Sequence, residues 1–276
     1  KVDDAIERAI EKDVFDDGLK DSEVISSQVD STRAEKFRAA YVAHLSTEMN
    51  GLRLDGFRIA VDCANGAASD LAPALFRGFG ADVIAFNDKP NGRNINTDCG
   101  SLHLDHLQCK VLETKSDFGV AFDGDADRAL FVDEKGSIVD GDGTLWIMAK
   151  YFQEHGGLKN DKVVATVMSN LGLERALLAR KIKLVRTQVG DRHVVEAMRK
   201  GGLNLGGEQS GHLIFLDHAT TGDGLLTALQ VLEILVASGK SLDDLTSILI
   251  ARARIRGSTL FANSSRLDQP SSGARP

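Results

Sequence analysis

The sequence has 276 residues, enough for about two domains, and its 42% hydrophobic and 26% charged residues are typical of a globular protein. The net charge of −7 and the lack of an apolar stretch of roughly 18 residues argue against nucleic acid and a membrane as partners. Three cysteines without metal-ligand spacing predict reduced thiols and a cytoplasmic location.

Up to about Asn50 the chain is charged and has the period of helices, with a polar loop predicted from Ser22 to Thr32. A capping pattern at Ser31 or Thr32 predicts the start of the second helix. The apolar stripes of the two helices comprise Ala5, Ile6, Ala9 and Ile10 in the first, and Phe37, Ala40, Tyr41, His44 and Leu45 in the second.

Two stretches of similar length follow, and each predicts a β-α-β unit. The first has strands at 58–62 and 81–86 around a helix at 70–78, and the second has strands at 162–167 and 182–186 around a helix at 173–180. Such units predict an α/β protein: two consecutive three-layer α/β domains with mixed, mainly parallel sheets. The boundary is expected near Gly156-Gly157, after a helical run at 144–154.

The last predicted helix runs from Gly222 to Ser238, and residues 251–276 are expected to be disordered because they are rich in arginine and poor in apolar residues. The leucines of this helix share one face, which predicts a core helix and not a binding surface. They are Leu225, Leu226, Leu229, Leu232 and Leu235.

The sequence DGDADR at Asp123–Arg128 lies between two apolar runs that predict short buried strands. Carboxylates so close together repel one another unless a cation neutralises them, and hard divalent cations select oxygen ligands. The planar fork of Arg128 suits a phosphate that the same metal would touch. Asp123, Asp125 and Asp127 therefore predict a divalent-metal site that handles a phosphorylated ligand.

Two other interpretations of DGDADR stay open. An Asp/Gly-rich turn without a metal is common between strands. A calcium loop matches the positions of the aspartates and of Glu134, but Arg128 stands where the sharp turn of that loop needs glycine, and strands replace its flanking helices. The acidic net charge also argues against the aspartate clusters of polymerases and nucleases.

A second polar cluster, GEQSGH at 207–212, directly precedes another apolar run. Its glycines predict a tight loop, and the donors and acceptors of Glu208, Gln209, Ser210 and His212 suit sugar hydroxyls. A hairpin turn with incidental polar residues is the alternative.

The two clusters together resemble the α-D-phosphohexomutase superfamily. Within it, VDCANGA at 61–67, VGDR at 189–192 and TTGDG at 220–224 are most similar to bacterial phosphoglucosamine mutases, as is Gln209 within GEQSGH. The resemblance runs from about Lys1 to Ile250. It implies that residues 1–54 are the helical end of a first domain, 55–156 a metal-binding second domain and 157–250 a sugar-binding third domain.

The resemblance implies a reversible transfer of phosphate between the 6-hydroxyl and the 1-hydroxyl of glucosamine phosphate, through a phosphoserine and a bisphosphate intermediate. Mg2+ would be held by the three aspartates and a phosphoserine oxygen, and Arg128 would hold the same phosphate. The other implied roles are sugar binding by Glu208 and Ser210, proton transfer by His212, and contact of Arg192 with the sugar or its phosphate, for which a surface ion pair is the alternative.

The sequence departs from the family pattern because it has no Ser-His pair, whereas the phosphoserine loop of the family has a Ser-His-Asn-Pro core. We therefore expect a fragment that lacks domains 1 and 4 of the full-length enzyme and has no turnover by itself. The alternatives are a fragment of a phosphomannomutase or phosphoglucomutase, and a non-catalytic protein that binds phosphosugar or metal.

Overall fold

The computed structural model describes residues 4–15 and 31–247. Residues up to Ala40 form one compact unit, with helix α1 (Asp4–Phe15) and the start of α2 (Ser31–Glu48), and residues from Tyr41 form another. The polar segment predicted to separate the first two helices lies mostly outside the described residues, as does the tail predicted after residue 251. Among the described helices, none has the length and apolar character needed to cross a membrane.

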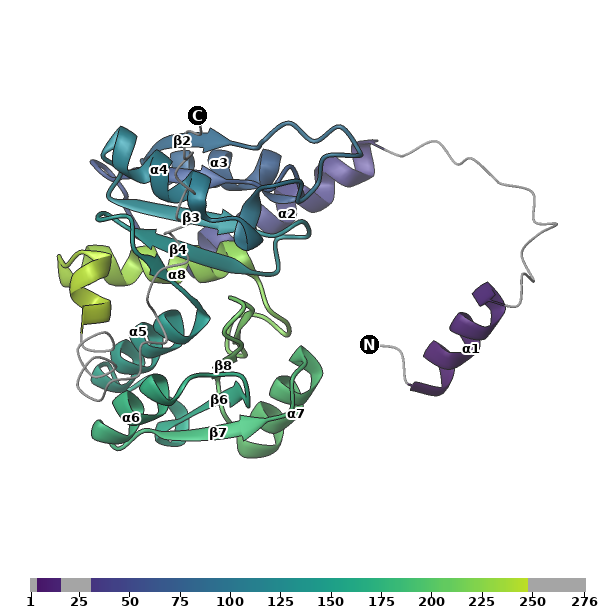
Figure 1. The fold of residues 1–276 in the computed structure, drawn as a ribbon, viewed down its shortest axis with the longest axis vertical. Coiled ribbons are helices and arrows are strands. Elements are labelled where there is room, and N and C mark those ends of the chain that lie inside the picture. Colours follow the sequence, from purple (N-terminus) through teal and green to yellow (C-terminus); the bar gives the residue numbers. More distant parts are fainter. Residues whose placement is uncertain (1–3, 16–30, 248–276) are drawn as a thin grey trace, which may run out of the picture. The chain divides into compact units, whose positions relative to one another are not determined.

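The first sheet of the larger unit has the strand order β2-β1-β3-β4-β5. Its strands β2, β3 and β4 are labelled in Figure 1. Strand β1 pairs in parallel with β2 and β3, whereas β3–β4 and β4–β5 are antiparallel. Alternate residues of β1 face different layers: Ile59 belongs to the core cluster that includes the buried residues of α3, whereas Ala60 packs with α4. The elements are β1 (Arg58–Asp62), α3 (Ala68–Gly78), β2 (Asp82–Phe86), η1 (Gly100–Leu102), α4 (Asp105–Thr114), β3 (Phe118–Phe122), β4 (Ala129–Asp133) and β5 (Ile138–Val139).

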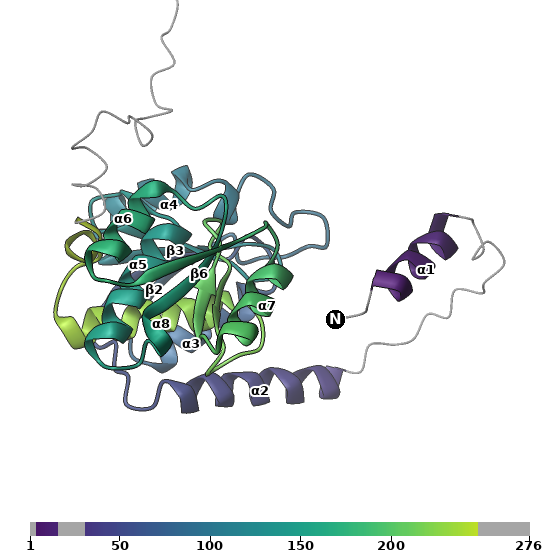
Figure 2. The ribbon, with the colours of Figure 1, turned by 90° about the horizontal axis from the view of Figure 1, so that it is seen from below.

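The second sheet has the order β7-β6-β8-β9, with parallel pairs β6–β7 and β6–β8 and an antiparallel pair β8–β9. Helix α7 packs on one face, where Val194 and Met198 contact Val164, and α5 and α6 cover the other face (Figure 2). The elements are α5 (Gly141–Glu154), η2 (Lys159–Asp161), β6 (Lys162–Thr166), α6 (Leu171–Ala179), β7 (Lys183–Thr187), α7 (Asp191–Gly201), β8 (Leu205–Gly207), β9 (Leu213–Phe215) and α8 (Gly224–Ser238).

The predicted fold class is confirmed: two three-layer α/β domains with mixed sheets follow one another along the chain. Helix α8 contacts β4 of the first sheet and α5 beside the second, and its five stripe leucines are buried as predicted. The boundary near Gly156-Gly157 stays a prediction; α5, which precedes it, contacts both β5 and α6.

Side-chain caps fix the start of three helices near the site. The side chains of Asp140, Asn170 and Asp223 accept hydrogen bonds from the N–H groups at the first turns of α5, α6 and α8. Because these caps precede the apolar residues, α5 and α6 begin earlier than the apolar period predicted.

Candidate functional site

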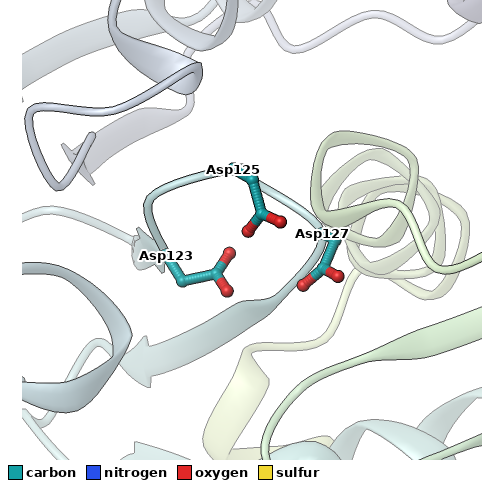
Figure 3. Close-up of side chains that lie close together, drawn as sticks. All are labelled: Asp123, Asp125 and Asp127. Carbon is teal, nitrogen blue, oxygen red and sulfur yellow. The ribbon is translucent and has the colours of Figure 1, made fainter. Parts of the chain in front are cut away.

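The DGDADR sequence forms the hairpin turn between β3 and β4, whose last pair is Phe122 with Ala129. Ala126 has a left-handed backbone, with φ of 61°, and its N–H donates to the Asp123 carbonyl at 3.2 Å. This turn points the carboxylates of Asp123, Asp125 and Asp127 toward one centre (Figure 3), and one oxygen from each lies within 4.8 Å of the others. Three converging oxygen ligands fit a divalent cation.

Two cationic or protonatable side chains border this cluster. The Nε atom of Arg128 lies 3.6 Å from Asp123 Oδ2 and 3.7 Å from Asp127 Oδ1. Nδ1 of the buried His212 lies 3.2 Å from Asp127 Oδ2. The structure therefore brings His212, far away in the sequence, into contact with the aspartate cluster.

The electrostatics of the cluster also favour a cation. Burial, and then the carboxylates of Asp127 and Asp125, raise the pKa of Asp123 to about 6, although the N–H of Arg128 donates to it and lowers the value. Asp127 Oδ1 is shielded from solvent and accepts no hydrogen bond from any described residue. A bound cation would compensate both the repulsion and the missing hydrogen bond of this oxygen.

The GEQSGH sequence forms the hairpin turn between β8 and β9, closed by the Glu208 N–H on the His212 carbonyl at 3.0 Å. The Gly211 carbonyl accepts the N–H of Ala129, the first residue of β4, at 3.1 Å. The hairpin geometry of the alternative interpretation is correct, but the turn is bonded directly to the end of the DGDADR loop. The two polar clusters therefore form one continuous region.

The predicted sugar-binding side chains differ in their surroundings. Glu208 Oε1 accepts the Gly190 N–H at 3.0 Å, and Ser210 Oγ is shielded from solvent with no hydrogen-bond partner among residues 31–247. Arg192 lies in the first turn of α7 and its Nε donates to Glu196 Oε1 at 2.9 Å. This contact is the surface ion pair of the alternative interpretation, and the roles of these residues in sugar binding stay predictions.

The N-terminus of α5 holds the GEQSGH turn in place. The Gly141 N–H donates to the Gln209 carbonyl at 2.9 Å, and Gln209 Nε2 donates to Asp140 Oδ2 at 3.3 Å. A Cβ on Gly141 would lie 2.0 Å from the Glu208 carbonyl, so glycine is required there. Sequence reasoning missed this contact, although the Asp-Gly-Asp-Gly run at 140–143 is a recognisable helix start.

Asp62 lies within the VDCANGA sequence, but its role was not predicted: it organises the loop beneath the metal cluster. Its buried carboxylate accepts hydrogen bonds from the N–H groups of Ala64 and Gly100, both at 3.0 Å. The loop after it packs against the DGDADR turn so closely that a Cβ on Gly66 would lie 2.3 Å from the Gly124 carbonyl. VDCANGA therefore supports the aspartates from behind.

Comparisons with known proteins identify the family to which the two α/β domains are similar. Residues 39–136 match the family described as phosphoglucomutase/phosphomannomutase, alpha/beta/alpha domain II, and residues 140–252 match its domain III. A curated phosphoglucosamine mutase from Solibacter usitatus is 49% identical over 249 residues, which are 90% of this chain and 55% of the relative. The chain thus spans about half the length of such relatives.

Two solved structures share the fold. A phosphoglucomutase/phosphomannomutase family protein from Burkholderia thailandensis is 26% identical with a TM-score of 0.65, over 78% of this chain and 46% of that chain. The N-acetylphosphoglucosamine mutase of Aspergillus fumigatus, solved with GlcNAc-6P and magnesium, is 22% identical with a TM-score of 0.58, over 77% of this chain and 49% of that chain.

Proposed function

The chain belongs to the phosphoglucomutase/phosphomannomutase family, and on this premise we propose that it carries the metal side and the sugar side of a mutase centre. The proposed reaction moves phosphate reversibly between the 6-hydroxyl and the 1-hydroxyl of glucosamine phosphate. The observation that supports it most is the direct bond between the two loops, from the Ala129 N–H to the Gly211 carbonyl. A metal-binding loop and a sugar-binding loop in contact can hold the phosphoryl group and the sugar of the same phosphate transfer.

In the proposed centre Asp123, Asp125 and Asp127 hold Mg2+, the metal present in the Aspergillus fumigatus neighbour. When bound, the ion would withdraw charge from the phosphoryl group in transfer. Arg128 would hold the same phosphate, because its guanidinium already lies beside Asp123 and Asp127. His212 would keep the Asp127 carboxylate oriented, since its Nδ1 contacts Oδ2 at 3.2 Å, and it stays the proposed group for proton transfer.

Glu208 and Ser210 are the proposed contacts of the sugar hydroxyls. The Gly190 N–H occupies Oε1 of Glu208, which leaves Oε2 to accept from a hydroxyl. Ser210 Oγ has no hydrogen bond within the described residues, so a sugar hydroxyl would supply its missing partner. Arg192 is the proposed contact of the sugar or its phosphate, and its Nε pairs with Glu196 at 2.9 Å.

The phosphoryl donor is a separate requirement. The resemblance implies a phosphoserine next to histidine, and the 276 residues contain no Ser-His pair. We therefore expect no mutase turnover from these residues by themselves. A test of the reaction has to combine them with a phosphoserine loop.

A chimera supplies that loop: residues 39–247 of this chain would replace the matching segment of the Solibacter usitatus relative. We expect the chimera to form glucosamine 1-phosphate from glucosamine 6-phosphate, and Asp125→Ala to lower the rate by about 100-fold or more, as loss of a catalytic metal does. Asp55→Asn is the control, because Asp55 is an exposed carboxylate paired with Arg53. A folded chimera without turnover would contradict the proposed activity. A chimera that prefers mannose 6-phosphate or glucose 6-phosphate would contradict the proposed sugar.

A further inference from the structure

We propose that Tyr41 and Asp223 are positioning residues that hold the DGDADR turn in its metal-binding shape. The inference rests on the proposed function, because it concerns the metal site named there. Neither residue belongs to the metal cluster. Each acts through the backbone that connects α8 to the turn.

The contact between Tyr41 and Asp223 ties α2 to the start of α8. The Tyr41 hydroxyl lies 2.9 Å from both carboxylate oxygens of Asp223 and donates to them. Burial and the nearby Asp223 carboxylate raise the pKa of Tyr41, so the phenol stays protonated and remains a donor. Asp223 Oδ1 also accepts the Leu226 N–H at 3.0 Å and so caps α8. The hydroxyl therefore fixes the carboxylate that sets where the helix begins.

The first N–H of α8 reaches the metal turn directly. The Gly224 N–H donates to the Ala126 carbonyl at 2.9 Å, and Ala126 lies between Asp125 and Asp127. A Cβ on Gly224 would lie 2.8 Å from that carbonyl and 2.6 Å from the carbonyl of Arg128. The α8 N-terminus is thus pressed against the backbone that carries the carboxylates.

The same segment supports the turn from a second side. A Cβ on Gly222 would lie 2.3 Å from Nε2 of His212, so the histidine ring packs flush against the backbone at Gly222. The other ring nitrogen of His212 contacts Asp127. Residues 222–224 therefore hold the turn at Ala126 and, through His212, at Asp127.

The turn needs such support for two physical reasons. Ala126 has φ of 61°, a left-handed conformation that is unfavourable for a residue other than glycine. The three carboxylates also repel one another when no cation is bound. A turn released from the Gly224 bond would relax toward an ordinary backbone and spread the carboxylates, which would weaken metal binding.

The chain offers a matched control for this inference. His218 Nδ1 contacts Glu48 Oε2 at 2.5 Å, and it ties the same helix α2 to the same segment before α8. No hydrogen bond or ion pair of His218 among the described residues involves the DGDADR turn. Tyr41→Phe and His218→Phe each remove one tie of α2 and keep an aromatic ring.

The test is Mn2+ binding by the 276-residue chain, followed by the electron paramagnetic resonance signal of free Mn2+. We expect Tyr41→Phe to weaken metal binding about five- to tenfold, which is less than the full effect of losing one hydrogen bond to a charged group, because the loss reaches the metal site only through the start of α8. His218→Phe should change the affinity less than about twofold. Asp223→Asn keeps a side-chain oxygen that can accept from Tyr41 and Leu226, so its affinity for Mn2+ should stay within about threefold of the parent's. Equal dissociation constants for the parent and Tyr41→Phe would overturn the inference.

Amide hydrogen exchange without metal separates this inference from the proposed metal site. Tyr41→Phe should speed exchange of the Gly224 amide about fivefold or more, because its acceptor Ala126 is held less firmly, and His218→Phe should not. If the parent binds no Mn2+, the proposed metal site is wrong. The exchange rate of the Gly224 amide would still show whether Tyr41 and Asp223 hold the DGDADR turn. An unchanged Gly224 rate in Tyr41→Phe would refute this role.

Discussion

Replacing Asp142 by asparagine should stabilise the folded protein at neutral pH and leave its stability at acidic pH unchanged. Asp142 is buried in the first turn of α5, where its Oδ2 accepts the Asn170 N–H at 2.7 Å. Burial is the main cause that raises its pKa to about 6, and the Asn170 N–H opposes it. The carboxylate therefore ties the loop before α6 to α5, but its charge is costly.

The size of the effect follows from the two pKa values. An unfolded aspartate has a pKa of about 3.9, and each pKa unit corresponds to about 1.4 kcal/mol, so the charge costs about 3 kcal/mol above pH 6. Between these two values the folded state holds a proton that the unfolded state has lost, and stability falls as the pH rises. Below about pH 3.9 both states are protonated and the cost disappears. Asparagine is neutral throughout and can still accept the Asn170 N–H.

Urea unfolding of both proteins at pH 4 and at pH 7.5 measures this effect. The gain in unfolding free energy of Asp142→Asn over the parent should be about 2–3 kcal/mol larger at pH 7.5 than at pH 4. Other carboxylates with a raised pKa, such as Asp123, are present in both proteins and cancel. A difference below about 1 kcal/mol would refute the assignment of a costly buried charge.

Two further substitutions test the packing that positions the site. Gly141→Ala should lower the unfolding free energy by about 1–3 kcal/mol, because its Cβ would meet the Glu208 carbonyl at 2.0 Å. Gly157→Ala is the control, because the atom nearest to its Cβ would be 3.7 Å away. Equal unfolding free energies of the two variants would contradict the contact. Leu229→Ala should cost about 2–5 kcal/mol in urea unfolding because the side chain is fully buried in α8. A loss no larger than that of Val236→Ala, which is 40% exposed in the same helix, would show that α8 is not a core helix.

Strands were the most predictable part of the fold. The bounds of β1 match the predicted ones, because this strand is a short, mainly apolar run between loop residues. Helix α4 was not predicted, because its buried residues are Leu107 and Val111 and two positions give only a weak helical period. Helix α7 was also missed, although Val194 and Met198 repeat at four residues and Asp191 opens its first turn.

The candidate site was predictable where it is local in the sequence. The three aspartates converge because one hairpin turn holds them, and their alternation already indicated this. The contact between His212 and Asp127 depends on how two hairpins from different sheets meet, so no local pattern could indicate it. The sequence singled out Gln209 only by the resemblance. Its hydrogen bond to Asp140 depends on the position of α5, which the sequence does not indicate.

Mn2+ titration of the parent chain and of Asp125→Asn shows whether the aspartate cluster binds a divalent metal, since Asp125 is the most exposed ligand of the cluster and its loss disturbs the fold least. We expect one saturable site in the parent, a loss of affinity of about tenfold or more in Asp125→Asn, and no change in Asp55→Asn. The absence of a saturable site, or equal affinity in the parent and Asp125→Asn, would contradict this expectation.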